Sequence, residues 1–283
     1  MGDTNNDILG FFKKHLVPLC VIFTKGGKAC PFFATAFILS AEDEWFLVTA
    51  GHVAEEIKSI LTDPNYSLVG AKLCDIGGLN AKHSMPIPFD LTPEKFIILG
   101  NEKTYDYAVI FLDPYYIRLL ERNGVEPLDE QVWLYQPIEP EFFTMLGVAK
   151  QMVSPLWNED KSVIDGIGVA TTLHRVDHSP QRPKGIEEKN APRWYGYIST
   201  DSSIDDIVGM SGAPIFAFKH TDGGGLKYWL IGVQSSWNHG NKAIAACPAQ
   251  NLGLLLSNLV KEIRDLQSKQ KIETKTPKRG NPT

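Results

Sequence analysis

The stretch Gly209-Met210-Ser211-Gly212-Ala213-Pro214 places one serine between two glycines, directly before an apolar run at 215–218. Glycines on either side of a serine let the backbone pass close to a bound group and present N–H donors to it. A serine hydroxyl is a poor nucleophile at neutral pH unless a base and an orienting carboxylate lie nearby. If Ser211 is a nucleophile, the chain must supply those two partners elsewhere.

Two other segments contain such partners, each beside a strand-like run. Thr49-Ala50-Gly51-His52-Val53 places His52 after an apolar run, and Tyr105-Asp106-Tyr107-Ala108-Val109-Ile110 begins a run with Asp106. Histidine suits the role of base because its pKa lies near neutrality, and a carboxylate fixes its tautomer. We therefore expect His52, Asp106 and Ser211 to act together as a catalytic triad. Asp113 is a rival carboxylate, but Asp113-Pro114 is typical of a turn.

Charge and hydropathy narrow the class of protein. The chain has 283 residues, with 28 basic and 33 acidic residues and a formal net charge of −5. That balance argues against a nucleic-acid partner, which a basic surface would attract. No apolar run approaches the roughly 18 residues needed to span a bilayer. We therefore expect a globular protein that binds neither nucleic acid nor membrane.

Cysteine spacing bears on metals and on compartment. Four cysteines are scattered and form no Cys-x-x-Cys pair, so no zinc site is expected. The N-terminus has no basic segment followed by an apolar stretch, so we expect no secretory signal, reduced thiols and a cytoplasmic location. His174 and His178 have a helical metal-binding spacing, but nearby prolines disfavour a helix there. We expect no metal and no cofactor.

Short apolar runs separated by turn residues predict an all-β chain. These runs lie at 17–24, 32–40, 45–50, 66–74, 95–99, 107–112, 142–149, 163–171, 195–199, 214–219 and 228–235. Glu42-Asp43-Glu44 predicts a hairpin turn between two of them. Helical spacing of apolar residues occurs at 53–61, directly after the histidine, and again from residue 249.

The three motifs T-A-G-H-V, Y-D-Y-A-V-I and G-M-S-G-A-P, in this order, resemble those of the trypsin/chymotrypsin-like serine proteases. The resemblance covers residues 15–248. A single motif of this kind occurs by chance, whereas three in order beside strand-like runs are specific. The resemblance implies two six-stranded antiparallel β-barrels, an active site in the cleft between them, and a closing C-terminal α-helix.

The implied domains follow the chain in order. They are an N-terminal segment at 1–14, a first β-barrel at 15–120, a second β-barrel at 121–248, a C-terminal helix at 249–267 and a disordered tail at 268–283. The charged, proline-containing segment 174–193 lacks periodicity and is expected to be a surface loop inserted in the second barrel.

The resemblance also implies a role for each site residue. His52 is the general base, Asp106 its orienting partner and Ser211 the nucleophile, and the N–H groups of Gly209 and Ser211 form an oxyanion hole. The run 231–237 resembles the strand on which these enzymes lay an extended substrate. Gln234, Ser235 and Ser236 are therefore candidate substrate-binding residues.

Departures from the family pattern are informative. Met210 stands where secreted members have an aspartate that pairs with a newly cut N-terminus, and Val53 stands in place of a disulfide-bonded cysteine. Both suggest an intracellular, bacterial-type trypsin-like peptidase domain. Asp205 stands where the specificity pocket of the family has its base, which would favour Lys or Arg in the substrate. The same residue also fits a solvated loop at 201–206.

Two functions from different classes remain open. The first is a serine endopeptidase that cleaves protein or peptide substrates through an acyl-enzyme. The second is a non-catalytic or partner-regulated peptide-binding module on the same fold, with a regulatory partner of unknown identity. An esterase of the α/β-hydrolase kind is disfavoured because its triad runs in the order Ser, Asp/Glu, His.

Overall fold

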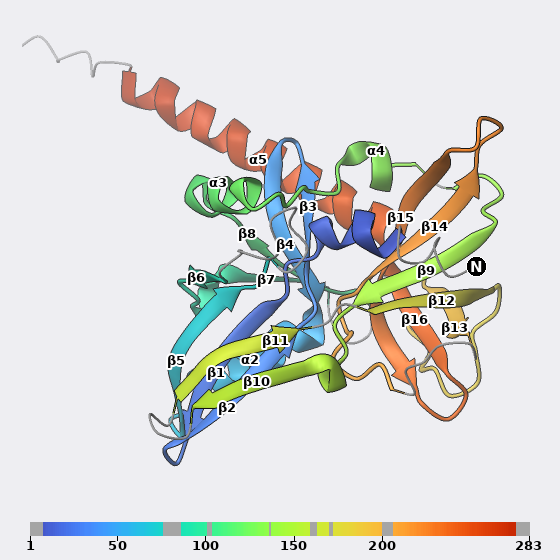
Figure 1. Ribbon diagram of the computed structural model, residues 1–283. Helices are drawn as coiled ribbons and strands as arrows, with labels where there is room; N and C mark the ends of the chain where they lie inside the picture. Colours follow the sequence, from blue (N-terminus) through green and yellow to red (C-terminus); the bar gives the residue numbers. More distant parts are fainter. Residues whose placement is uncertain are drawn as a thin grey trace, which may run out of the picture.

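A computed structural model describes residues 8–75, 86–100, 104–135, 137–158, 163–169, 172–199 and 206–275. This part of the chain consists mostly of β-strands, arranged in two halves (Figure 1). The second half contains a closed six-stranded barrel, and a long α-helix ends the described chain. The expectations of a mostly β fold, a six-stranded barrel and a C-terminal helix are confirmed.

The N-terminal half forms two four-stranded antiparallel sheets, in the orders β2-β1-β5-β6 and β3-β4-β8-β7. Their strands are β1 (Leu19–Lys25), β2 (Lys28–Ala34), β3 (Phe37–Ala41), β4 (Glu44–Ala50), β5 (Tyr66–Leu73), β6 (Ile87–Phe89), β7 (Phe96–Gly100) and β8 (Asp106–Phe111). One core is shared by both sheets, with Val21 and Leu47 among its residues. An isolated bridge between Leu16 and Phe37 joins the sheets at one corner.

The described residues of this half do not close into the six-stranded barrel that was expected for it. Each sheet keeps its own edges, and β6 is only three residues long, so it offers little backbone for further pairing. The hairpin between β3 and β4 does form as predicted. Glu42 and Asp43 adopt φ of 53° and 64°, the paired left-handed conformation of a two-residue hairpin turn.

The barrel of the second half has the strand order β12-β13-β16-β15-β14-β9. Its strands are β9 (Phe142–Gly147), β12 (Thr172–Ser179), β13 (Trp194–Ile198), β14 (Pro214–His220), β15 (Leu226–Asn238) and β16 (Ala243–Pro248). A separate hairpin joins β10 (Val153–Asn158) to β11 (Val163–Val169).

The segment expected as a loop at 174–193 begins with a strand. β12 pairs with β9 and β13, and along it buried and exposed residues alternate. The alternation was hard to recognise in the sequence because one inward residue is a histidine, His174, which is only 1% exposed. The connecting segment is therefore 180–193.

Two of the helices, α2 (Gly51–Thr62) and α5 (Ala249–Lys275), lie where the sequence predicted helical spacing. The others are α3 (Pro114–Arg122) and α4 (Glu130–Trp133), with short 3₁₀ turns η1 (Lys13–His15), η2 (Pro93–Lys95) and η3 (Lys150–Met152). α3 packs on the core of the N-terminal half through Tyr116 and Leu120, whereas Trp133 of α4 lies in a core shared by both halves. α5 continues beyond residue 267 and extends away from the strands (Figure 1), while 276–283 lie outside the described residues.

A second core lies between the two halves. Phe46 and Val48 of β4 pack in it with Phe216 of β14 and Leu252 of α5. Burial of large apolar side chains is the main stabilising contribution to such a contact. The interface therefore holds the end of β4, the start of β8 and the 209–214 stretch in one place. In the described residues, no helix combines the length and the apolar character that crossing a membrane requires.

Candidate active site

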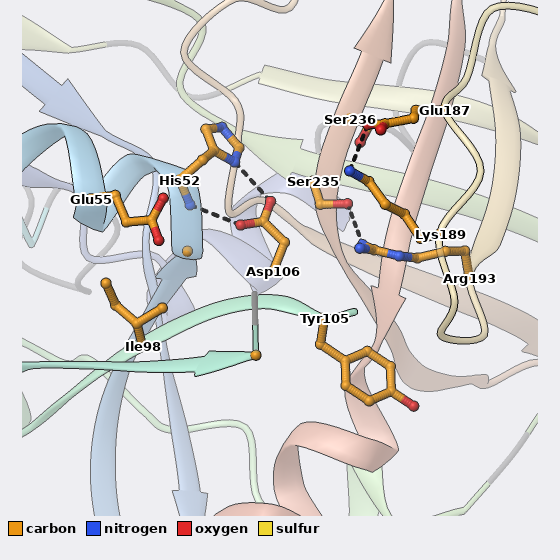
Figure 2. A pocket seen from close by; sticks show the side chains of 12 residues that line it. His52, Glu55, Ile98, Tyr105, Asp106, Glu187, Lys189, Arg193, Ser235 and Ser236 are labelled. Carbon is orange, nitrogen blue, oxygen red and sulfur yellow. Dashed lines mark hydrogen bonds and ion pairs between the residues drawn. The ribbon is translucent and has the colours of Figure 1, made fainter. Parts of the chain in front are cut away.

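His52 lies two residues after the end of β4, and Asp106 is the first residue of the neighbouring strand β8. β4 pairs with β8 in an antiparallel register that sets Ala50 opposite Tyr107. Gly51 and Asp106, the residues beyond this pair, are therefore adjacent. The backbone N–H of His52 donates to Asp106 Oδ1 at 2.8 Å, and its ring Nδ1 donates to Oδ2 at 2.7 Å (Figure 2). This two-point contact leaves Nε2 of the imidazole as the proton acceptor.

Gly51 makes this contact sterically possible. A Cβ atom at residue 51 would lie 2.7 Å from Asp106 Oδ1 and 3.3 Å from the carbonyl oxygen of Tyr107. Any side chain there would push the carboxylate away from His52. The glycine of the T-A-G-H-V motif is therefore explained by the close approach of the carboxylate.

The two groups shift each other's pKa in opposite directions. Burial alone would lower the pKa of His52, but the hydrogen bond and the negative charge of Asp106 outweigh it, so the pKa is raised above 6.5. Burial would raise the pKa of Asp106, but His52 and the positive charge of Arg193 outweigh it, so that pKa is lowered. Asp106 is thus ionised at neutral pH, and the imidazolium form of His52 is stabilised.

The stretch that contains Ser211 lies against the end of β4 through Gly212. Gly212 has φ of +92°, and a Cβ atom there would lie 2.5 Å from Thr49 Oγ1 and 2.9 Å from the N atom of Ala50. Gly212 directly follows Ser211 and contacts Thr49 and Ala50, which lead into His52. Ser211 is half-buried, and no hydrogen bond joins its Oγ to His52. Such contacts are often long in unliganded sites.

In residues 209–212, backbone N–H groups with an acceptor among the described residues alternate with groups that have none. The N–H groups of Met210 and Gly212 donate to carbonyl oxygens of the protein at 2.9 Å each. Those of Gly209 and Ser211 have no acceptor among the described residues. Since buried or half-buried N–H groups are nearly always paired, two free donors two residues apart indicate a place for an external acceptor.

The carbonyl group in the same peptide unit as each free N–H accepts a hydrogen bond, which fixes the orientation of that peptide. The carbonyl of Val208 accepts from the N–H of Lys150 at 2.7 Å, and that of Met210 accepts from the N–H of Ala213 at 2.9 Å. Because a trans peptide is planar, its N–H points away from its own carbonyl. The two free donors therefore point away from Lys150 and Ala213, whose N–H groups hold the carbonyls.

Thr35 is a site residue that sequence reasoning missed. Its Oγ1 donates to the carbonyl oxygen of Gly209 at 2.9 Å, and it accepts from the N–H of Val148 at 3.1 Å. Its own carbonyl accepts from Thr49 Oγ1 at 2.8 Å. Thr35 belongs to the N-terminal half, so one hydroxyl connects that half to the 209–214 stretch.

The candidate substrate-binding residues lie at an irregular part of β15. The β15–β16 register shifts between Gln234 and Ser236, which leaves Ser235 in a β-bulge. Pairing of β15 with β14 ends at Val233, and beyond Gln234 no described strand pairs with the side of β15 opposite β16. The Gln234 side chain donates to the Ser236 carbonyl at 3.1 Å. Asp205 lies outside the described residues.

A pocket of about 370 Å³ opens beside His52, between the two halves (Figure 2). Its walls include Glu55 of α2 and Ile98 of β7 on one side, and Ser235 and Ser236 of β15 on the other. The segment 180–193 contributes three charged residues to this wall, namely Glu187, Lys189 and Arg193. Sequence reasoning did not identify them, because their segment has no periodicity and lies far from the motifs.

The side chains that could bind a metal are dispersed in the described residues. Among the described residues, no group of three or more His, Cys, Asp or Glu side chains is placed to hold an ion. His174 and His178 both lie on β12, and His174 is buried. The ring of His178 stacks on Trp194 at 5.4 Å between centroids.

Comparison with known proteins gives only distant similarities. No family model and no curated protein matches the chain. A solved thermostable serine protease from an extremophilic microorganism has 11% identity and a TM-score of 0.47, covering 85% of this chain and 95% of that one. Protease Anisep from Arthrobacter nicotinovorans has 14% identity and a TM-score of 0.43, covering 83% and 90%.

The Rv3671c protease from M. tuberculosis has 12% identity and a TM-score of 0.37, covering 88% of this chain and 82% of its own. These neighbours are trypsin/chymotrypsin-fold serine proteases. With such low identities and TM-scores below 0.5, the similarities carry no conclusion about chemistry. The function must be inferred from the residues of this chain.

Proposed function

We propose that this chain is a serine endopeptidase in which Ser211 is the nucleophile, His52 the general base and Asp106 the orienting carboxylate. The observation that carries the proposal is the two-point contact between His52 and Asp106. Gly212, which directly follows Ser211, packs on the end of the strand that leads to His52. A base held in one tautomer by an ionised carboxylate is the arrangement that activates a hydroxyl.

The proposed reaction has two steps. In the first, Ser211 Oγ bonds to the substrate carbonyl carbon while its proton passes to His52 Nε2; the C–N bond then breaks, and the amine leaves with that proton. In the second, His52 removes a proton from water, whose oxygen attacks the acyl carbon. The C–O bond to Ser211 breaks, its oxygen regains the proton, and the acid leaves.

The free N–H groups of Gly209 and Ser211 would stabilise the oxyanion of each tetrahedral intermediate. Donors whose direction is already set need no reorganisation when negative charge develops. The hydrogen bonds to Val208 and Met210 on the other side of each peptide support that assignment.

An extended peptide is the substrate class that fits β15. The unpaired side of the strand after Gln234 leaves backbone groups available for a further antiparallel strand, which is how many peptide-binding sites gain affinity. We keep Gln234, Ser235 and Ser236 as substrate-binding candidates on this basis. Ser235 would act through its backbone, since its hydroxyl already bonds within the protein.

Labelling by a fluorophosphonate probe tests the proposal directly, because the probe reacts with an activated serine. Wild type should be labelled, whereas Ser211→Ala and His52→Ala should not be. Ser268→Ala is the matched control, since Ser268 lies on the exposed part of α5 and should keep full labelling. Absence of Ser211-dependent labelling, with binding of extended peptides retained, would instead support a peptide-binding module.

The proposed preference for Lys or Arg at the cleavage site has its own test. Peptide panels that differ only at the residue before the cleaved bond should show faster cleavage after Lys or Arg than after Leu or Phe. Asp205→Asn should reduce that ratio. A preference for apolar residues would show that Asp205 does not form the base of a specificity pocket.

A further inference from the structure

Arg193 connects the two halves of the protein directly beside the His52–Asp106 pair. It is the last residue of the segment 180–193 and directly precedes β13. Its Nη2 donates to the carbonyl oxygen of Thr104 at 2.5 Å, two residues before Asp106. Its Nη1 donates to Ser235 Oγ at 2.8 Å, on β15 of the barrel (Figure 2).

A sulfur atom extends this connection to Asp106 itself. Arg193 Nη1 also donates to Cys247 Sγ, on β16. The same sulfur accepts the backbone N–H of Asp106 at 3.2 Å. The guanidinium thus holds the chain before Asp106 through Thr104 and supports the Asp106 backbone through Cys247.

The segment that carries Arg193 is held in place by contacts of its own. Ile186 is 4% exposed and packs on Ala243 and Ala245 of β16. Asn238 Nδ2 donates to the carbonyl of Gly185 at 3.1 Å, where a Cβ atom on residue 185 would collide with the amide. A guanidinium delivered by a fixed segment can position other groups, whereas one on a mobile loop would not.

The chemistry of the site favours a cation over a side chain that merely fills space. Burial disfavours the ionised form of Asp106, and Arg193 lies close enough for its charge to oppose that effect. The Nε of Arg193 is buried and has no hydrogen-bond partner among the described residues. An unpaired buried donor is unfavourable, so packing alone does not explain an arginine here.

We propose that Arg193 is a positioning residue for the His52–Asp106 pair: it fixes the segment before Asp106 against β15 and β16 and places a permanent positive charge beside the carboxylate. This rests on the proposed protease function for its kinetic consequences only. The guanidinium has a planar fork that can hold Thr104 and Ser235 at once, which a lysine ammonium cannot do in the same geometry.

The first test replaces the guanidinium with an uncharged side chain of similar length, in Arg193→Met. We expect kcat for peptide hydrolysis to fall at least tenfold, with KM changed less than threefold, because the proposed role of Arg193 is to position the His52–Asp106 pair. Arg118→Met removes an equally positive residue from the exposed face of α3 and should leave both constants unchanged. A wild-type kcat in Arg193→Met would overturn the proposal.

The second test needs no turnover. In ¹⁵N-histidine NMR, the ring of His52 should titrate at lower pH in Arg193→Met than in wild type, since a displaced Asp106 stabilises the imidazolium less. Equal titration in both proteins would overturn the proposal. This measurement separates the two ideas: if wild type shows no Ser211-dependent labelling, the protease function fails, while the His52 titration still tests Arg193.

Arg193→Lys keeps the test decisive if the methionine variant does not fold. It retains the charge and should fold, as checked by circular dichroism and by the melting temperature. Its kcat should lie between those of wild type and Arg193→Met, because a lysine cannot hydrogen-bond Thr104 and Ser235 at once in the same geometry. Wild-type kcat together with wild-type His52 titration in Arg193→Lys would show that the fork has no positioning role.

Discussion

The hydroxyl of Thr35 donates to the carbonyl oxygen of Gly209 at 2.9 Å, across the boundary between the two halves of the protein. Thr35 is only 1% exposed, so this bond is shielded from water. It holds the Gly209–Met210 peptide, which directly follows the free N–H of Gly209. The position of the proposed oxyanion hole therefore depends on a residue of the half that carries His52 and Asp106.

Thr35→Val should lower activity and stability together. Valine keeps the shape of threonine but leaves the Gly209 carbonyl and the Val148 N–H without their partner, at a cost of about 1–3 kcal/mol in unfolding free energy. We expect kcat to fall by roughly 10–100-fold, less than the loss of an oxyanion-hole donor itself. Steady-state kinetics and urea unfolding measure both effects. Thr35→Ser retains the hydroxyl and should stay close to wild type; an equal loss in that variant would contradict the explanation.

The pH dependence of activity should reflect the raised pKa of His52. Catalysis needs the neutral imidazole, so kcat/KM should fall as the pH drops through that pKa, with a midpoint above the ordinary value of 6.5. In Asp106→Asn the charge that stabilises the imidazolium is gone. The midpoint should then move to lower pH, and kcat should fall by about 10⁴-fold. A pH profile of both proteins checks this, and an unchanged midpoint would mean that Asp106 does not set the pKa of His52.

Gly212→Ala should destabilise the fold at the contact between the halves. A φ of +92° is strained for alanine, and the added Cβ would lie 2.5 Å from Thr49 Oγ1. We expect a loss of about 2–4 kcal/mol in unfolding free energy, together with loss of probe labelling at Ser211. Gly223→Ala is a suitable control because nothing lies within 4 Å of its Cβ position. Similar stability for both variants in denaturant unfolding would exclude the predicted collision.

Two buried histidines should make the fold sensitive to mild acid. Burial lowers the pKa of His15 and of His174 to about 4, from an ordinary value of 6.5. Between these values the unfolded chain binds more protons than the folded one, so stability decreases as the pH falls from 6.5 to 4. The effect is about 3 kcal/mol for each histidine.

His15→Asn tests this, since its amide can still donate to the carbonyl that His15 contacts at 2.8 Å. The change in unfolding free energy between pH 6.5 and 4 should shrink by about 3 kcal/mol in this variant. His239 is exposed, so His239→Asn should leave the pH dependence as it is in wild type. An unchanged acid dependence in His15→Asn would show that this histidine is protonated in the folded state.

Local signals in the sequence were sufficient for several features. Apolar runs and turn residues identified most strands, and the hairpin at Glu42 and Asp43 formed as predicted because a two-residue turn is set by its own backbone. The pairing of His52 with Asp106 could be anticipated because each adjoins the end of a strand-like run. Helix α5 was recognised from its apolar spacing up to Leu266, but its end was not, since residues 268–275 are mostly polar and do not continue that spacing.

The sequence by itself determined which residues can do chemistry and in what order they occur: a histidine, an aspartate and a serine, each beside a strand-like run. Only the tertiary structure decided what surrounds them. Thr35 and Gly209 are 174 residues apart, and Arg193 and Thr104 are 89 apart, so their hydrogen bonds leave no local pattern. Such bonds exist only once burial between the halves has brought distant segments together, and they are what orients the groups named by the motifs.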